Sequence, residues 1–300
     1  MRAVEIADVG PRDGFQSIQA FIPTQRKIEI IEGLVQAGVR HIMLTSFVSP
    51  KAIPQLRDAA QICAQLLPRY PDVDFFALTP NRRGVADAWA AGLRRVSYVI
   101  SVSESHNQAN LARSVDISFR DLAQIRAEFP QMHICLDVAT AFGCPFEGIL
   151  PLEKVLAFVE RGVSIGVDEF NLCDTVGLAT PQQVQALLGT LIPRYPGARF
   201  DVHIHDTRNL GILNTMTAIQ CGAAQVQTAL GGLGGCPFAP GASGNTATED
   251  LVYLLDRMGY ETGINFEKLL ALARLERRWI DGNYSGHQLN ITAPCCVQGG

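Results

Sequence analysis

Two histidines separated by one residue, His203 and His205, are the most informative local feature of this 300-residue sequence. They end an apolar, strand-like run, and residues i and i+2 of a strand point to the same side. Both imidazoles can therefore hold one metal ion. Asp13 and Asn245 also lie beyond the ends of strand-like runs. Together the four residues offer two imidazoles, one carboxylate and one amide oxygen.

A mixed nitrogen and oxygen ligand set without a thiolate suits Mg2+ or Mn2+, with Co2+ and Zn2+ as further options. Octahedral coordination by such a set leaves positions open for substrate oxygens, which a Lewis-acid site requires. The alternative is that backbone groups or water satisfy both histidines, as is usual for a lone histidine. The paired spacing, with Asp13 and Asn245 at other strand ends, favours the metal site.

Two further residues could act directly on a substrate. Arg12 lies in the turn-forming sequence Gly-Pro-Arg-Asp-Gly, where a fixed cation would stabilise a developing oxyanion. Its alternative is an ordinary salt bridge at a strand end. Cys236 lies in a glycine-rich stretch that predicts a mobile flap over the site. Its alternative is an inert, buried thiol.

The elements that must position these residues alternate along the chain. Short runs rich in apolar or β-branched residues predict strands, and amphipathic stretches between them predict helices. Eight strands alternating with helices within about 260 residues predict an α/β fold, the (β/α)8 TIM barrel. A doubly wound open sheet is the alternative, but no GxGxxG follows the first strand. The predicted strands span residues 3–9, 42–47, 73–78, 96–102, 133–138, 169–172, 200–205 and 226–229.

The chain shows no linker and no break in composition, so we expect one barrel domain over residues 1–300. Residues 266–279 predict an additional helix outside the eightfold repeat. We expect the region 262–300, this helix and the tail, to pack on the barrel or on a partner. In such a barrel the carboxyl ends of the strands build the active site.

Composition and charge argue against several classes of function. A net charge of −4 without a run of Lys or Arg argues against a nucleic-acid surface. No stretch reaches ~18 uninterrupted apolar residues, so no membrane span is expected. Several of the eight cysteines lie in apolar runs, which favours a reducing, cytoplasmic compartment. This reasoning does not explain Cys295 and Cys296.

The motifs resemble those of the 3-hydroxy-3-methylglutaryl-CoA lyase family, within the DRE-TIM metallolyases. The resemblance implies a lyase that uses Mg2+ or Mn2+ to cleave a 3-hydroxy-3-methyl acyl-CoA substrate to acetyl-CoA and a keto acid. It also implies a homodimer. The matching stretches cover nearly the whole predicted barrel and lie at residues 9–14, 45–51, 142–148, 174–177, 203–207, 231–237 and 241–245.

The resemblance also implies roles for individual residues. Arg12 matches the arginine that steadies the thioester enolate, and Cys236 matches the flap cysteine credited with proton transfer. Asp174 matches a further acid needed for activity. The base that removes the hydroxyl proton stays open between Asp13, Asp174 and a histidine-linked water. The family's metal ligands match Asp13, His203, His205 and Asn245.

Four departures from the family cluster around the predicted site. Met43 stands where the family usually has glutamate, and Arg208 begins a segment that usually reads Tyr-Gly-Gln. Ser17 follows Gln16 where asparagine is usual, and Asp8 replaces a glutamate. An arginine can bind a carboxylate through two hydrogen bonds. We therefore predict substrate contacts at Gln16, Met43, Ser46, Thr175 and Arg208.

These departures lead to the hypothesis of a substrate whose carboxylate lies one carbon closer to the hydroxyl. That substrate is citramalyl-CoA, which splits to pyruvate and acetyl-CoA, whereas 3-hydroxy-3-methylglutaryl-CoA gives acetoacetate. Neutral drift around the site is the alternative. We expect the CoA phosphates near Asn81, Arg82 or Arg83.

Two other functions stay open at this point. A Claisen-type synthase would join acetyl-CoA to a 2-keto acid, but such relatives usually carry a larger C-terminal region than the single extra helix and tail predicted here. An inactive homologue that only binds metal or CoA would be expected to lack Arg12, Cys236 or a metal ligand. All of these residues are present, which favours the lyase.

Overall fold

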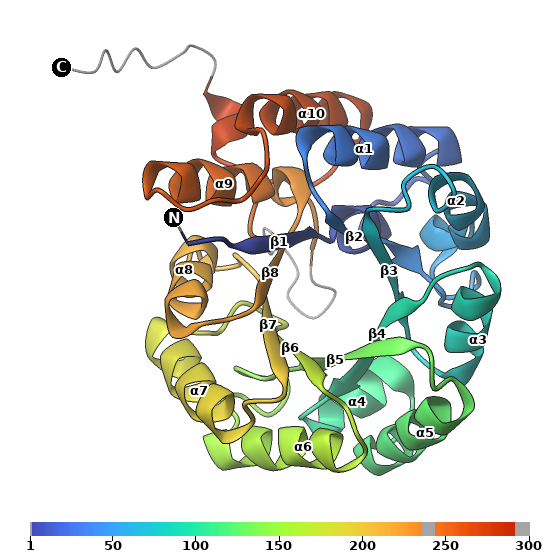
Figure 1. Cartoon of the computed structure of the whole chain (residues 1–300), viewed down its shortest axis with the longest axis vertical. Coiled ribbons are helices and arrows are strands. Elements are labelled where there is room, and N and C mark those ends of the chain that lie inside the picture. The colour runs from blue at the N-terminus through green and yellow to red at the C-terminus, as the bar shows by residue number, and fades with distance from the viewer. Residues whose placement is uncertain (1, 236–243, 292–300) are drawn as a thin grey trace.

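The computed structural model describes residues 2–235 and 244–291. Eight parallel strands close into a barrel, in which each strand pairs with the next and β1 pairs with β8 (Figure 1). All eight predicted strands are confirmed, and so is the (β/α)8 barrel. The strands are β1 (Glu5–Asp8), β2 (His41–Ser46), β3 (Asp74–Thr79), β4 (Arg95–Ser101), β5 (His133–Ala139), β6 (Glu169–Asp174), β7 (Arg199–Ile204) and β8 (Gln225–Thr228).

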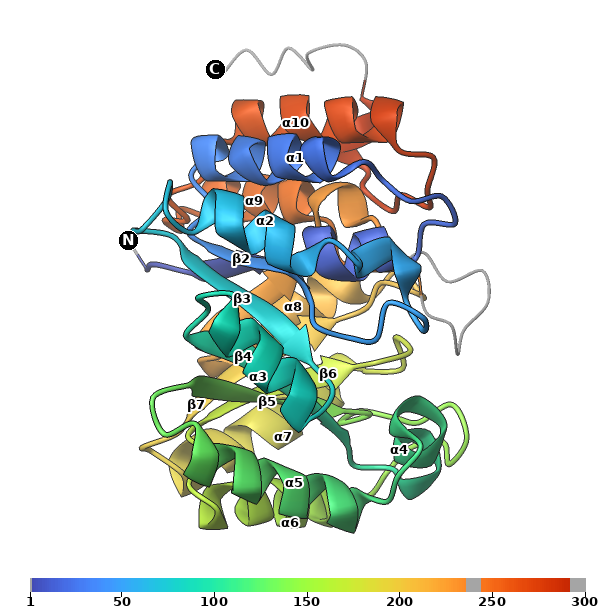
Figure 2. The same ribbon diagram turned by 90° about the vertical axis from the view of Figure 1, so that its right-hand side faces the viewer.

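Helices surround this barrel on the outside (Figures 1 and 2). A short π-helical turn, η1 (Gly10–Gly14), follows β1, and a 3-10 turn, η3 (Leu230–Gly232), follows β8. Two more 3-10 turns are η2 (Pro54–Leu56) and η4 (Gln288–Asn290). The α-helices are α1 (Thr24–Ala37), α2 (Ala59–Leu66), α3 (Arg82–Ala90), α4 (Glu104–Leu111), α5 (Val115–Glu128), α6 (Leu152–Ser164), α7 (Pro181–Arg194), α8 (Gly211–Cys221), α9 (Thr248–Arg257) and α10 (Phe266–Trp279).

The local sequence explains where helices begin. Thr180 accepts a hydrogen bond from the backbone of Gln183, whose side chain bonds back to Thr180, and Pro181 occupies the first turn of α7. This capping box satisfies amide groups that have no partner within the helix. Asn81 caps α3 in the same way by accepting from Gly84 N.

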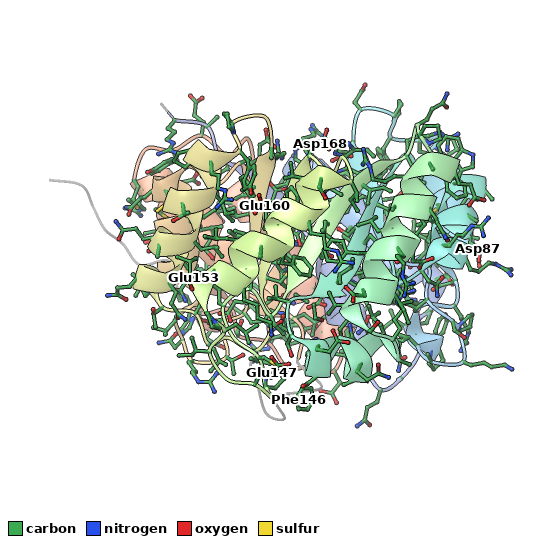
Figure 3. The ribbon with its side chains drawn as sticks, turned by 90° about the horizontal axis from the view of Figure 1, so that it is seen from below. Asp87, Phe146, Glu147, Glu153, Glu160 and Asp168 are labelled. Atoms are coloured by element: carbon green, nitrogen blue, oxygen red, sulfur yellow. The ribbon has the colours of Figure 1, made fainter. Side chains whose placement is uncertain are left out.

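The two ends of the barrel differ. Asp168, which precedes β6, lies at one end, whereas Phe146 and Glu147, which follow β5, lie at the other (Figure 3). Because the strands are parallel, every segment that follows a strand reaches the second end. We call this end the mouth, and it is where a (β/α)8 barrel carries its chemistry.

The apolar core has two parts. The larger part fills the space between strands and helices, as doubly covered parallel strands require. A smaller cluster, formed by Ala7, Val9, Met43 and Phe76, comes from β1, β2, β3 and the residue after β1. These positions alternate with those that face the helices, so this cluster lies inside the barrel.

Helix α10 extends the repeat and packs against α1 and α9 of the same chain (Figure 1). The contact is close, because a methyl group at Gly33 of α1 would collide with Leu272 of α10. Leu269, Leu272 and Ala273 of α10 are buried within the chain. Over residues 2–235 and 244–291, no helix is both long enough and apolar enough to cross a membrane.

Three buried carboxyl groups meet where α9 and α10 approach β1. Asp8 accepts hydrogen bonds from Gly10 N at 2.9 Å and Thr248 Oγ1 at 2.7 Å. Glu249 accepts from Gly231 N at 2.9 Å. Burial raises the pKa of Asp8 to about 7 and that of Glu249 to about 8, and it also raises the pKa of Glu276. The folded chain therefore favours the neutral acids.

Glu249→Gln is expected to weaken the pH dependence of stability. The pKa of Glu249 rises from 4.5 to about 8 on folding. Below pH 4.5 the group is protonated in both states and has no effect on the pH dependence of the free energy of unfolding. Above pH 4.5 the unfolded chain releases this proton more readily, so the folded chain loses stability as the pH rises. Wild type should lose on the order of 2 kcal/mol more than the variant between pH 5 and 8. Glutamine cannot ionise and keeps an acceptor for Gly231 N.

Urea unfolding at several pH values measures this difference. Glu153→Gln, on the exposed surface of α6, is the matched control. Parallel pH curves for wild type and Glu249→Gln would contradict the prediction.

Candidate metal centre

The two predicted imidazole ligands meet at the mouth. His203 lies in β7 and His205 directly follows it, and their Nε2 atoms are 2.9 Å apart. His205 Nε2 is 3.8 Å from Asp13 Oδ2. One donor atom from each of these three residues lies within 4.8 Å of the others. The structure therefore brings together the three ligands predicted from distant parts of the sequence.

Asp13 is held by the turn after β1. The backbone N–H groups of Arg12 and Asp13 donate to Val9 O at 3.0 and 2.8 Å, and the Phe15 N–H donates to Gly10 O across the π-helical turn η1. Gly14 packs against Leu233, where an added methyl group would lie 3.1 Å from the leucine side chain. The carboxylate thus projects from a rigid turn at the edge of the barrel.

Asn245 joins the group through the backbone and the side chain. It forms a β-bridge with His205, and Asp206 N donates to Gly244 O at 2.8 Å. Its Nδ2 donates to Asp13 Oδ2 at 2.9 Å and to Leu233 O at 3.1 Å. The fourth predicted ligand therefore contacts the first.

The residues present fit a cation. Asn245 Oδ1 is buried and lacks a hydrogen-bond partner within the described ranges, and the Nε2 atoms of both histidines face each other and Asp13. Burial lowers the pKa of His203 to about 3 and also lowers that of His205, which keeps both imidazoles neutral. Burial opposes the charge on Asp13, but Arg12, the two histidines and the Asn245 hydrogen bond together outweigh it and lower that pKa to about 2. Neutral imidazoles and an ionised carboxylate are the forms that bind metal.

Arg12 lies beside the candidate ligand Asp13 and is mostly buried. One guanidinium nitrogen pairs with Asp13 Oδ1, and Nε donates to Met43 Sδ at 3.0 Å. Met43 is fully buried in β2. A thioether is a weak acceptor. Among the described residues, Asp13 is the one carboxylate that forms an ion pair with Arg12.

A second group of possible metal ligands is less suitable. Cys135, Glu169 and Asp201 also lie within 4.8 Å of one another. Arg95 pairs with Glu169 and lies 3.9 Å from Asp201 Oδ2, so its charge already offsets these acids. Burial raises the pKa of the Cys135 thiol, which disfavours the thiolate that would bind a metal. We assign no ion to this group.

Asp174 is buried at the end of β6, and its carboxylate bonds to backbone amides. Its two oxygens accept from Leu178 N at 2.8 Å and Ala179 N at 3.1 Å. Burial raises its pKa to about 6. These contacts shape the loop before α7, and the sequence did not reveal them.

Three predicted substrate residues bond to neighbouring strands and loops. Thr175 Oγ1 accepts from Thr140 N at 2.8 Å, and Ser46 Oγ donates to Leu78 O at 3.0 Å. Arg208 Nη1 donates to Val176 O at 3.0 Å and Gly177 O at 2.9 Å. These contacts join Arg208 to the loop after β6, so part of its guanidinium is already occupied.

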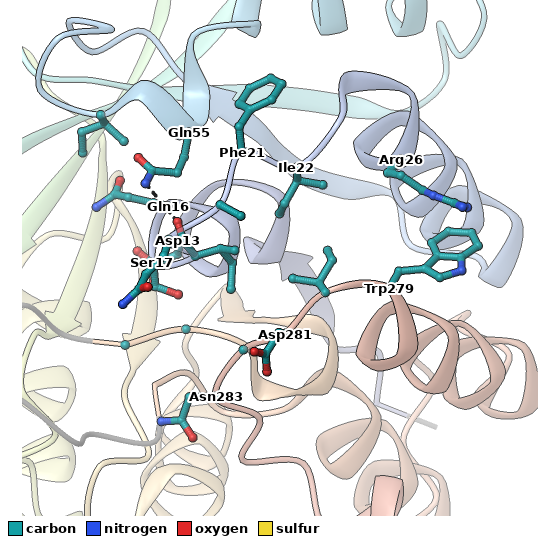
Figure 4. Close-up of a pocket in the computed structure, with 18 of the residues that line it drawn as sticks. Asp13, Gln16, Ser17, Phe21, Ile22, Arg26, Gln55, Trp279, Asp281 and Asn283 are labelled. Carbon is teal, nitrogen blue, oxygen red and sulfur yellow. Dashed lines mark hydrogen bonds between the residues drawn. The ribbon is translucent and has the colours of Figure 1, made fainter.

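A cavity of about 950 Å³ extends from Asp13 to Arg26 and Trp279 (Figure 4). Asp13 and Gln16 line its inner part, and Arg26 lies against Trp279 at the other end, with Cζ 3.9 Å from the ring. The residues predicted to meet CoA phosphates do not line this cavity. Arg82 pairs with Glu128, and the neighbouring Arg83 pairs with Asp87.

Other predicted residues lie outside the described ranges, namely Cys236, Cys295 and Cys296.

The structure adds a buried polar group that sequence reasoning did not select. Asn171 Nδ2 donates to Asp137 Oδ1 at 2.9 Å and Gln227 Oε1 at 3.1 Å. Gln227 is also paired in register with His203. The alternation of residues along β5, β6 and β8 was the signal that could have located this group.

Comparison with known proteins identifies the family. The HMGL-like family model matches residues 3–275. The chain belongs to the HMGL-like family. It is 40% identical over 282 residues to the hydroxymethylglutaryl-CoA lyase YngG of Bacillus subtilis, covering 93% of each chain. It is 41% identical to the (R)-citramalyl-CoA lyase of Chloroflexus aurantiacus, covering 90% of this chain and 89% of the other.

Solved structures of HMGL-like relatives agree closely with this fold. An HMG-CoA lyase of Acinetobacter baumannii, in complex with coenzyme A and 3-methylmalate, is 35% identical, with a TM-score of 0.93. The alignment covers 99% of this chain and 97% of that one. The Bacillus subtilis HMG-CoA lyase structure is 39% identical, with a TM-score of 0.90 and coverage of 96% and 97%.

We expect the purified chain to bind one Mn2+ ion at this site. Asp13→Asn removes the negative charge of one donor and His203→Ala removes an imidazole donor, and each should raise the dissociation constant at least roughly 10-fold. Isothermal titration calorimetry measures this at a constant pH. His41→Gln, at the beginning of β2 and hence at the opposite end of the barrel, is the control. Equal affinities for wild type and both ligand variants would exclude the site.

Proposed function

We propose that this chain is a divalent-metal-dependent carbon–carbon lyase that splits a 3-hydroxy-3-methyl acyl-CoA into acetyl-CoA and a keto acid. The single observation that carries the proposal is the convergence of Asp13, His203 and His205 with Arg12 at the barrel mouth. Two relatives, the hydroxymethylglutaryl-CoA lyase of Bacillus subtilis and the (R)-citramalyl-CoA lyase of Chloroflexus aurantiacus, support the reaction class. The neutral imidazoles and oxygen donors favour Mg2+ or Mn2+ as the ion.

The reaction balances without an oxidant or a second substrate. The hydroxyl on C3 loses its proton, its oxygen becomes the carbonyl of the keto acid, and the C2–C3 bond breaks. The electron pair stays on C2 as the thioester enolate, which then takes up a proton to give acetyl-CoA. A bound divalent ion would act as a Lewis acid that lowers the pKa of the hydroxyl.

The side chains divide the remaining tasks. Arg12 carries a permanent charge in a mostly buried place, which suits it to offset the enolate oxygen. As general base we favour Asp174 over Asp13, because burial raises the pKa of Asp174 to about 6 while Arg12 keeps Asp13 at about 2. By resemblance, Cys236 would return the proton to C2.

The cavity beside Asp13 suits the long acyl-CoA arm. Its walls combine apolar residues such as Ile22 and Ile53 with the polar Gln16, and its outer part carries Arg26. A flexible pantetheine chain needs such a mixed channel, and an arginine at the rim suits a phosphate.

The homodimer implied by the resemblance stays a prediction. The apolar residues Leu269 and Leu272 of α10 are buried within the chain and do not provide its interface.

A specific contact favours citramalyl-CoA as the substrate within this class. A glutamate at position 43 would pair with Arg12, whereas Met43 accepts only a weak hydrogen bond through sulfur. Arg12 therefore retains more charge for a substrate carboxylate close to the reacting carbon. The relatives include a (R)-citramalyl-CoA lyase, and one solved structure holds 3-methylmalate, a short hydroxy diacid.

The proposal is tested by giving the purified protein each thioester with Mg2+ or Mn2+. We expect acetyl-CoA and pyruvate from citramalyl-CoA, and no cleavage once EDTA has removed the ion. Acetoacetate from 3-hydroxy-3-methylglutaryl-CoA without pyruvate from citramalyl-CoA would reject the shorter substrate and retain the reaction class. Cleavage that survives EDTA would reject the metal role.

Met43→Glu is expected to shift the preference between the two thioesters. The added carboxylate would neutralise part of the Arg12 charge, so kcat/KM for citramalyl-CoA should fall relative to that for 3-hydroxy-3-methylglutaryl-CoA by roughly tenfold. Met43→Gln has the same length without charge and serves as the control. If the glutamate and glutamine variants change the ratio of the two kcat/KM values equally, charge at this position does not set specificity.

A further inference from the structure

The chain returns to the mouth after α10. We propose that residues 283–287, here called the clasp, position Asn245 and the beginning of the glycine-rich loop for metal binding. This inference rests on the proposed function, because it gives the C-terminal segment a task in that same site.

Ser285 provides the most direct contact. Its Oγ donates to Asn245 O at 2.9 Å and lies 3.4 Å from Gly232 O. The side chain of Asn245 contacts Asp13, while the backbone of Asn245 bridges to His205. Ser285 therefore fixes a candidate ligand from the side opposite its barrel neighbour, and its side-chain hydrogen bonds within the described ranges go only to Asn245 O and Gly232 O.

Backbone contacts extend the clasp along the glycine-rich loop. Gly286 N donates to Gly231 O at 3.0 Å, and Gly234 N donates to Asn283 O at 3.4 Å. A methyl group at Gly231 would lie 2.6 Å from the Tyr284 ring, so the two segments are in close contact there. The loop is thus held at both ends of its described part, next to Leu233, whose carbonyl accepts from Asn245.

The clasp is itself anchored on α9. The backbone N–H groups of His287 and Gln288 donate to the Asp250 carboxylate at 2.7 and 2.9 Å. Glu249, the residue before Asp250, accepts from Gly231 N on the other side. Helix α9 therefore holds both the clasp and the loop that the clasp contacts, and their relative position does not depend on the clasp alone.

Matched variants can separate positioning from general stability. Ser285→Ala removes the donor to Asn245, and Ser285→Thr restores a hydroxyl. Gly286→Ala would place a methyl group 3.1 Å from Gly231 O and in collision with Glu249 Oε1. The controls make the same changes elsewhere. Ser164→Ala removes a hydroxyl that bonds to Arg161 O in α6, and Gly197→Ala adds a methyl group where nothing lies within 4 Å.

Two measurements on the full chain report on the clasp. Mn2+ affinity comes from the EPR signal of free ion, and hydrogen–deuterium exchange follows peptides that span residues 229–235 and 244–248. We expect the Mn2+ dissociation constant to rise about fivefold in Ser285→Ala and roughly tenfold in Gly286→Ala. Exchange in both peptides should become faster, Ser285→Thr should restore both values, and the two controls should match wild type.

The outcomes distinguish failure of the clasp from failure of the metal site. Unchanged affinity in Ser285→Ala and Gly286→Ala, with Mn2+ bound by wild type, would overturn the clasp. So would a lower melting temperature without any change in affinity, since that indicates a structural role alone. If wild type binds no Mn2+, the metal site is refuted. The exchange data on Ser285→Ala and Gly286→Ala then decide about the clasp. Faster exchange supports a clasp that positions the loop, and unchanged exchange rejects it.

Discussion

The mouth depends on the electrostatic balance around one carboxylate. Asp13 is buried, and burial alone would favour its neutral form. Arg12 holds it ionised from one side, while Asn245 donates to its other oxygen. Arg12 is the largest of the contributions that lower the pKa of Asp13 against burial. The adjacent pair Arg12 and Asp13 therefore works as a unit: one supplies the charge that binds the ion, and the other keeps that charge present.

The barrel explains why the histidines can serve the same ion. His203 and His205 are two residues apart at the end of β7, so both rings point to the same side, into the barrel. Burial lowers the pKa of His203, which keeps its ring unprotonated. Beneath them the interior is divided. Ala7, Val9 and Phe76 make one side apolar, whereas Asp137, Asn171 and Gln227 make the other side polar. Met43 belongs to the apolar side and contacts Arg12 only through its sulfur.

The sequence predicted the fold and the candidate metal ligands that the structure brings together, because both depend on strong, short-range patterns. Eight apolar runs identified the strands, and the spacing of His203 and His205 identified a common face. The bonds of Arg208 to the loop after β6 could not be predicted in this way, because they depend on where two loops meet in space. The same holds for Asp174, whose oxygens cap backbone amides four and five residues further on. Strand parity would have located Asp137 and Asn171, had it been applied to the lower positions of the strands.

The glycine-rich loop poses a physical problem that the C-terminal segment answers. Glycines allow a chain to approach a ligand closely, but they also increase the conformational freedom lost on ordering. Asn245 comes after such a stretch and must still place its amide within hydrogen-bonding distance of Asp13. The bridge to His205 fixes one side of its backbone, and Ser285 fixes the other. An additional helix outside the eightfold repeat thus has a reason beyond covering the barrel. It carries the chain back to Asn245, a candidate ligand that lies outside the eight strands.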